Sequence, residues 1–315
     1  MPLDPDAQAL AEALDALLPG PLHSLGVDGA RALAEQLGEQ SPPPPPLHLV
    51  EQRTIPGPAG EIPIRVYRPS PETDLPVLLY FHGGGWTIGT LDGVETLCRT
   101  LSEKAHCVVV SVDYRLAPEH KFPAAVEDCY AALEWVAAHA GEIGADAGRI
   151  AVGGDSAGGN LSASISILAR DRNGPQIALQ LLVYPATEYA VERASWREHA
   201  TASLLTAEDV LWFWGHYLRD EADRSDPRAT PSNAPSLAGL PPAFVLTAEY
   251  DPIRDDGEQY AQRLREAGVP VIAKRYPRVF HGFFTMVGLL GKTKEALEDA
   301  AARLNDAFAR PRAEG

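Results

Sequence analysis

Cysteine is scarce in this chain of 315 residues, which has only Cys98, Cys107 and Cys129. An odd number cannot pair completely in disulfides, and the spacing matches neither a CxxC pair nor a zinc site. We therefore expect no metal site. Reduced thiols in the core or near the surface are expected instead, as is typical of a cytoplasmic protein.

Long apolar runs are also lacking. No stretch approaches the roughly 18 apolar residues that a membrane-spanning helix needs. The start of the chain, Met1 to Asp6, is acidic and has neither the basic residues nor the apolar core of a signal peptide. We expect neither a leader nor a membrane partner.

Basic charge is low relative to acidic charge. Lysine and arginine total 27 against 43 for aspartate and glutamate, which gives a net charge of −16. Such a balance repels phosphate backbones and anionic lipid headgroups, so we expect no nucleic-acid partner. The apolar content of 45% is sufficient for a large buried core.

Two kinds of pattern follow one another along the chain. Residues 4–18 and 28–38 have apolar residues at helical spacing, and the proline run 42–46 then forms an extended spacer. From residue 47 onward strands alternate with helices, which predicts a mostly parallel sheet covered on both faces. The expected strands are 47–54, 61–68, 76–81, 107–112, 149–153, 178–184, 243–248 and 270–276. The expected helices are 91–105, 123–140, 157–170, 254–268 and 293–309.

One insert, 189–236, interrupts this alternation and contains a helix rich in aromatic residues. We expect residues 1–46 and 189–225 to form a helical cap over the carboxyl edge of the sheet. The main catalytic domain would then comprise 47–188 and 226–315. The alternative is that these helices are peripheral and take no part in a pocket.

Polar residues follow four of the expected strands, and in open parallel sheets ligands bind at that carboxyl edge. Ser156 lies in Gly154-Asp155-Ser156-Ala157-Gly158-Gly159, shortly after strand 149–153. The small residues permit a sharp turn that presents the serine hydroxyl to a pocket. The other three strand ends carry His82 with a run of three glycines, Asp251, and His281.

A serine hydroxyl is a weak nucleophile, so Ser156 needs a base, an acid that orients the base, and donors for an oxyanion. Serine, aspartate and histidine follow in the chain order of the α/β-hydrolase fold. Asp255 is a rival acid, but it stands at an expected helix start, where capping or stabilisation of the helix dipole is the simpler explanation, so we favour Asp251. His82 is expected to brace its loop by hydrogen bonds.

The chain resembles the hormone-sensitive-lipase-like esterases, the bacterial family IV carboxylesterases, over about residues 40–310. The resemblance rests on HGGGW at 82–86, DYRLAPE at 113–119, GDSAGG at 154–159, DPIRD at 251–255 and HGF at 281–283. It implies an α/β-hydrolase fold with a mostly parallel eight-stranded sheet, flanking helices and a helical cap. It also implies Ser156 as nucleophile, His281 as base and Asp251 as orienting acid.

The same resemblance assigns the oxyanion hole to the N–H groups of Gly84, Gly85 and Ala157, with Gly83 as a further candidate. One residue departs from the family pattern: Arg278 stands where a glycine is usual. The substitution leaves the triad intact and is expected to alter the entrance or the mobility of the loop.

The expected activity is that of a serine carboxylesterase acting on small, short-to-medium-chain acyl esters without a metal or cofactor. Trp86, Leu205 and Phe283 are expected to line the acyl pocket, although each also fits a plain core position. Two alternatives stay open: an amidase or formamidase on the same fold, and a non-catalytic ligand receptor, against which the presence of His281 argues. The family also suggests a homodimer, formed through edge strand 270–276.

Overall fold

A single eight-stranded sheet organises the computed structural model, which describes residues 2–17, 20–39 and 42–310. The strand order across the sheet is β1-β2-β4-β3-β5-β6-β7-β8. β2 pairs antiparallel with β1 and β4, whereas every pair from β4 to β8 is parallel. The strands are β1 (Leu49–Gly57), β2 (Gly60–Arg68), β3 (Leu75–Phe81), β4 (Val108–Val112), β5 (Ala145–Asp155), β6 (Ile177–Val183), β7 (Ala243–Tyr250) and β8 (Val271–Phe280).

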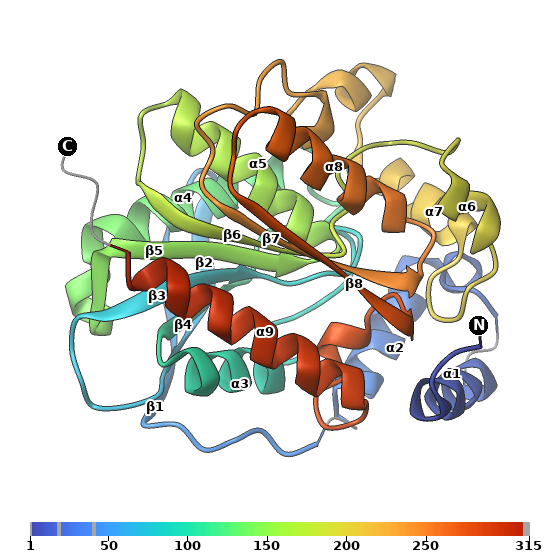
Figure 1. Ribbon diagram of the computed structural model, residues 1–315, viewed down its shortest axis with the longest axis horizontal. Helices are drawn as coiled ribbons and strands as arrows, with labels where there is room; N and C mark the ends of the chain where they lie inside the picture. The colour runs from blue at the N-terminus through green and yellow to red at the C-terminus, as the bar shows by residue number, and fades with distance from the viewer. Residues whose placement is uncertain (1, 18–19, 40–41, 311–315) are drawn as a thin grey trace.

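The sheet is buried on both faces because helices cover both of them (Figure 1). β3 is buried along its whole length, and its side chains alternate between two apolar clusters. Val77, Leu79 and Phe81 join the cluster that contains residues of α4 and α5. Leu78 and Tyr80 join the cluster of α3 and α9 on the opposite face. This two-sided burial explains the continuous apolar runs of the central strands.

The helices form two groups. Those that cover the sheet are α3 (Glu95–Ala105), α4 (Ala124–His139), α5 (Ala157–Asp171), α8 (Arg254–Glu266) and α9 (Gly291–Phe308). A second group lies at the end to which β6, β7 and β8 point (Figure 1): α1 (Pro5–Leu17), α2 (Gly26–Glu39), α6 (Ala194–Glu198) and α7 (Ala207–Tyr217). The short 3-10 helices are η1 (Leu22–Leu25), η2 (Ala140–Ile143), η3 (Glu221–Ser225), η4 (Pro231–Asn233) and η5 (Phe283–Thr285).

The fold expected from the sequence is confirmed, and the largest differences lie at element ends. β8 continues to Phe280 instead of ending at residue 276, although it contains Pro277. Proline is tolerated there because β8 is the last strand of the sheet and one side of it forms no ladder. The expected helix 91–105 begins only at Glu95. Within the described ranges, no helix is both long enough and apolar enough to cross a bilayer.

Candidate active site

Ser156 stands at the junction of β5 and α5, near the middle of the sheet. Its φ of 56° and ψ of −115° are unusual for a residue with a side chain, and such strain is concentrated at functional sites. The glycine at position 158 makes room for the turn. A Cβ on Gly158 would lie 1.9 Å from the carbonyl oxygen of Phe81, at the end of β3. The close approach of α5 to β3 therefore explains why this position is glycine.

Ser156, His281 and Asp251, the three residues singled out from the sequence, form one continuous chain of hydrogen bonds. His281 Nε2 is 3.0 Å from Ser156 Oγ, and His281 Nδ1 is 2.7 Å from Asp251 Oδ2. Asp251 is fully buried, and its other oxygen, Oδ1, accepts a hydrogen bond from Ile253 N at 2.9 Å. His281 is 6% exposed, and the centre of its imidazole lies 4.5 Å from that of the Tyr184 ring. This is the geometry in which a carboxylate orients an imidazole that can take the proton of a serine.

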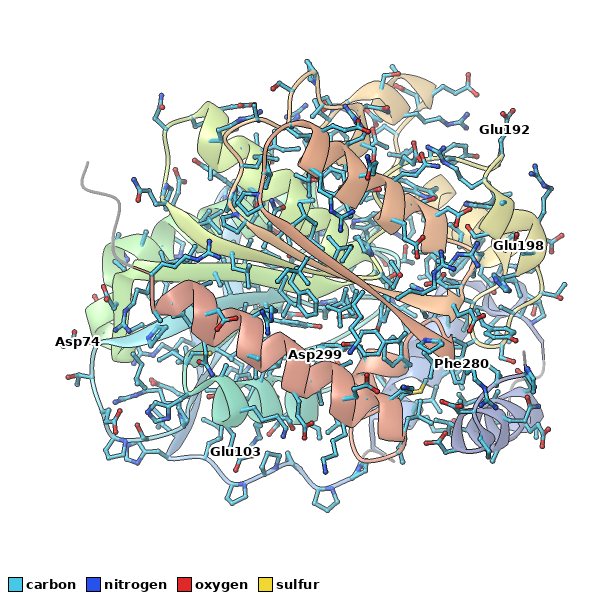
Figure 2. All side chains as sticks on the ribbon, viewed as in Figure 1. Asp74, Glu103, Glu192, Glu198, Phe280 and Asp299 are labelled. Carbon is cyan, nitrogen blue, oxygen red and sulfur yellow. The ribbon has the colours of Figure 1, made fainter. Side chains whose placement is uncertain are left out.

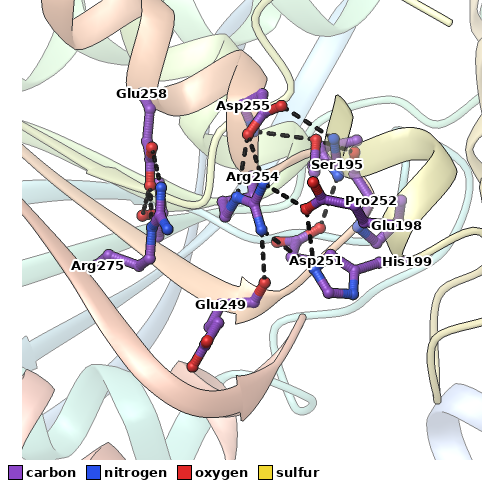
Figure 3. A network of polar contacts seen from close by, with 12 residues as sticks. Ser195, Glu198, His199, Glu249, Asp251, Pro252, Arg254, Asp255, Glu258 and Arg275 are labelled. Carbon is purple, nitrogen blue, oxygen red and sulfur yellow. Dashed lines mark hydrogen bonds and ion pairs between the residues drawn. The ribbon is translucent and has the colours of Figure 1, made fainter. Parts of the chain in front are cut away.

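Asp255, the rival acid, contacts neither Ser156 nor His281. Its carboxylate accepts a hydrogen bond from Ser195 N at 2.9 Å and pairs with Arg254 (Figure 3). No side-chain cap is formed at the start of α8, but Asp255 lies in the first turn of this helix, where the helix dipole favours a carboxylate. Asp255 therefore links α8 to α6.

His82 braces the glycine loop, as expected. Its Nδ1 lies 2.7 Å from the carbonyl oxygen of Gly83, and its ring stacks on Tyr114 with centroids 4.4 Å apart. Burial lowers the pKa of His82 to about 4 because the charged imidazolium would lose its hydration. The side chain is thus a neutral structural group near pH 7.

Asp155, which the sequence analysis did not single out, fixes the same loop from the other side. Its Oδ1 accepts from Tyr80 Oη at 2.7 Å and from Gly83 N at 3.1 Å. Burial raises the pKa of Asp155, while these donors oppose that shift. The only sequence signal for this role was its place beside Ser156.

The hydrogen bond to Asp155 occupies the N–H group of Gly83. By contrast, those of Gly84, Gly85 and Ala157 have no acceptor among the described residues. Ala157 is the first residue of α5, where the positive end of the helix dipole also favours an anion. Three unpaired donors therefore remain around Ser156.

A cavity of about 480 Å³ opens over Ser156 and His281. Trp86 and Leu205, which the sequence analysis assigned to the acyl pocket, are part of its lining, as are Gly84, Gly85 and Ala157. Its far walls are apolar and come from α1, α2 and α7; they include Leu10, Leu14, Leu33, Leu37, Val210 and Phe213.

Phe283 does not line this cavity, contrary to the sequence expectation. It is fully buried, with its ring 5.3 Å from that of Tyr276 and 5.9 Å from that of Tyr184. The chain turns after His281 through Gly282, whose φ is 88°, and this directs Phe283 into the core.

Phe213 takes a place in the wall that the sequence did not specify. A Cβ on Gly85 would lie 2.1 Å from Phe213 Cγ, so the aromatic ring packs directly on the glycine loop. Its neighbours on α7 are divided between two tasks. Trp214 also lines the cavity, whereas Tyr217 stacks on Trp86 at 4.2 Å and supports it from behind.

Comparisons with known proteins show which proteins this chain is similar to. A family model described as the alpha/beta hydrolase fold matches residues 78–285. "Carboxylic ester hydrolase LipN" of Mycobacterium tuberculosis is 48% identical over 268 residues, 83% of this chain and 70% of that protein. "Carboxylesterase NlhH" of the same species is 45% identical over 292 residues, 90% of each chain.

Solved structures of esterases are also similar to this chain. The hyperthermophilic esterase of the archaeon Pyrobaculum calidifontis is 42% identical and superposes with a TM-score of 0.92. The match covers 98% of this chain and 100% of that one.

Proposed function

Because this chain belongs to the alpha/beta hydrolase fold family and is a serine ester hydrolase, we propose that Ser156, His281 and Asp251 are its nucleophile, general base and orienting acid. The observation that carries this proposal is the continuous hydrogen-bonded line from Asp251 through His281 to Ser156, at the floor of an apolar cavity.

The reaction proceeds in two acyl transfers. Ser156 Oγ attacks the ester carbonyl carbon while His281 Nε2 takes the hydroxyl proton, and a tetrahedral oxyanion forms. The C–O bond to the alcohol then breaks as His281 returns the proton to the leaving oxygen, which leaves an acyl-enzyme on Ser156. Water, deprotonated by His281 Nε2, then attacks the acyl carbon. The bond to Ser156 Oγ breaks as His281 returns the proton to that oxygen, which releases the carboxylic acid and restores the serine. Asp251 holds the imidazole in the tautomer that both steps require.

The oxyanion is stabilised by the N–H groups of Gly84, Gly85 and Ala157. These three residues line the same cavity as Ser156, and their N–H groups have no acceptor among the described residues, whereas the Gly83 N–H already donates to Asp155. Donors fixed in place before reaction are effective because they need no reorganisation; in other enzymes a single donor contributes roughly 10²–10³ in rate.

The acyl group occupies the apolar cavity, in contact with Trp86 and Leu205. The leucines of α1 and α2 in its walls favour aliphatic chains, and a volume of about 480 Å³ suits short to medium lengths. Residues 1–46 and 189–225 form the cap and 47–188 with 226–315 the catalytic domain; residues 1, 18–19, 40–41 and 311–315 of these ranges lie outside the described structure.

The experiment that tests this function is hydrolysis of p-nitrophenyl esters from acetate to palmitate by the parent protein and by Ser156→Ala. We expect activity that peaks at acetate to octanoate and falls at least 10⁴-fold in the variant, as on removal of such nucleophiles elsewhere. Matched p-nitroanilides serve as the control. Faster anilide than ester hydrolysis, or activity that survives in Ser156→Ala, would overturn the assignment.

A homodimer is the proposed assembly, formed through β8. This strand is at the edge of the sheet and exposes 48% of Ile272. Light scattering coupled to gel filtration should give twice the chain mass of 33.8 kDa, and a single-chain mass would contradict the proposal.

The cytoplasm is the proposed compartment, in keeping with three buried, unpaired thiols at Cys98, Cys107 and Cys129. Cell fractionation tests it, and recovery of the protein from the culture medium would contradict it.

A further inference from the structure

Arg278, three residues before His281, has a backbone conformation that a side chain disfavours. Its φ of 63° is in the left-handed region, which is costly for any residue with a Cβ. β7 and β8 pair at Ala248–Tyr276 and again at Tyr250–Phe280, so four steps of β8 match two of β7. Arg278 stands in the resulting bulge. The glycine usual there in the family would be unstrained, so the reason for arginine must lie in its side chain.

The side chain of Arg278 binds residues 2–4, at the start of the described chain. Nε donates to the carbonyl oxygen of Pro2 at 2.9 Å, and Nη2 donates to that of Leu3 at 3.0 Å. Nη1 pairs with Asp4 Oδ1 at 3.1 Å, and the side chains of this pair are 34% and 21% exposed. The backbone adds a hydrogen bond from Asp4 N to Arg278 O at 2.9 Å. Four contacts thus fix three consecutive residues, directly before α1.

Helix α1, which directly follows residues 2–4, forms part of the cavity wall. Ala7 and Ala11 of α1 are buried in the same apolar cluster as Phe280, which Figure 2 labels near the end of β8. Leu10, Leu14 and Leu17, on the adjoining part of the same side of α1, line the cavity above Ser156. The place of the wall therefore depends on how firmly the start of α1 is held.

The main chain of Arg278 is hydrogen-bonded to a residue near the end of β7, just before Asp251. Its N–H donates to Glu249 Oε2 at 2.7 Å, and Glu249 lies two residues before Asp251. The carbonyl oxygen of Glu249 accepts from Arg254 Nη1 at 3.2 Å, and Arg254 Nη2 reaches Glu198 of α6 at 2.9 Å (Figure 3). Both cap segments are thus anchored on the loops that carry Asp251 and His281.

We propose that Arg278 is a positioning residue that holds residues 2–17 against the His281 loop and thereby sets the length of acyl chain that the cavity accepts. The second part rests on the proposed function, because it places the acyl chain against α1. When the contacts of Arg278 with residues 2–4 are lost, α1 moves away from the end of β8 and the cavity wall loosens. Long acyl chains then lose their packing, whereas an acetyl group, which stays near Ser156, does not.

The test compares Arg278→Gly with the parent protein. Glycine removes the side-chain contacts but accepts the backbone conformation, so the variant should fold. Asp4→Asn removes only the ion pair and should give a smaller effect in the same direction. Arg275→Ala is the matched control, because Arg275 is on the same strand and pairs instead with Glu258 of α8 at 2.6 Å.

Two readouts are needed. Hydrogen exchange of peptides within residues 4–17 should quicken at least tenfold in Arg278→Gly while β3 and β5 stay protected. KM for p-nitrophenyl octanoate should rise about fivefold or more, while kcat for the acetate changes less than twofold. Arg275→Ala should leave both readouts unchanged.

Unchanged exchange in residues 4–17 would overturn the proposal, as would faster exchange with an unaltered acyl-length profile. A failure of the proposed function has a different appearance: the parent protein would not hydrolyse either ester, or Ser156→Ala would remain active. The exchange measurement does not depend on that result.

Discussion

Asp251 and Asp255 are only four residues apart, yet their surroundings give them different tasks. Asp251 is fully buried and directs one oxygen at His281 Nδ1 and the other at a backbone N–H. Asp255 faces α6, where it accepts from Ser195 and pairs with Arg254. Partial burial favours a higher pKa for Asp255. Hydrogen bonds from Ser195 and the charge of the Arg254 guanidinium outweigh it and hold this pKa below its usual range. At the residue scale, therefore, the direction of a carboxylate decides its role.

Exchange of Asp251 for asparagine tests this division. In Asp251→Asn the amide nitrogen faces His281 Nδ1 and favours the wrong imidazole tautomer, so kcat should fall by roughly 10³–10⁴ while KM changes little. Steady-state kinetics with p-nitrophenyl butyrate is the measurement. Asp255→Asn is the control and should lose less than tenfold. An equal loss in both variants would mean that Asp255 takes part in orienting the base.

At the scale of elements, the sequence was sufficient wherever a pattern is local. Periodicity located all eight strands, because the pleat and burial on two faces leave a direct mark on composition. Partners distant in sequence leave no such mark. The contacts of Arg278 with Pro2 and Leu3, and the inward turn of Phe283, depend on how separate elements meet. Phe213 was recognised as part of an aromatic helix, but its contact with Gly85 requires the packed structure.

The junction of β5 and α5 offers a test at the same scale. In Gly158→Ala the new methyl group would lie 1.9 Å from Phe81 O, which is main chain and cannot swing away. We expect a loss of about 2–4 kcal/mol in the free energy of unfolding, within the range of overpacking and backbone strain, and a loss of activity as α5 shifts.

Gly141→Ala is the matched control for this prediction. It lies in a short helix, and a methyl group there would have no neighbour within 4 Å. Urea unfolding should show this variant unchanged or more stable by up to about 1 kcal/mol. Equal destabilisation by both substitutions would mean that crowding against β3 is not what requires glycine at position 158.

At the scale of the whole molecule, three arginines join α1, α2 and α6 to the segments around the sheet. Arg31 of α2 binds Glu119 with both carboxylate oxygens, at 2.7 Å each, and donates to the carbonyl oxygens of Thr87 and Ala117. Arg278 holds the start of α1, and Arg254 holds α6. All three attach near loops that carry the glycine run or the triad. The shape of the cavity is thus coupled to the catalytic loops through charged contacts at its rim.

Global stability should depend on pH through a buried group near these loops. The pKa of His82 is about 4 in the folded protein, against 6.5 for an unperturbed histidine. Between these values the unfolded chain binds a proton that the folded protein does not, so the stabilisation is complete above about pH 6.5 and is lost as the pH falls toward 4. The difference corresponds to about 3 kcal/mol at 1.36 kcal/mol per pKa unit.

We therefore expect the free energy of unfolding in urea to fall between pH 7 and pH 4, and to fall by about 3 kcal/mol less in His82→Gln than in the parent protein. The variant can be less stable at every pH, because only the difference in slope reports the buried imidazole. His48, which is exposed, provides the control: His48→Gln should retain the slope of the parent. If His82→Gln kept that slope as well, the acid sensitivity would have to come from other groups. His82 would then not be buried in its neutral form against the glycine loop.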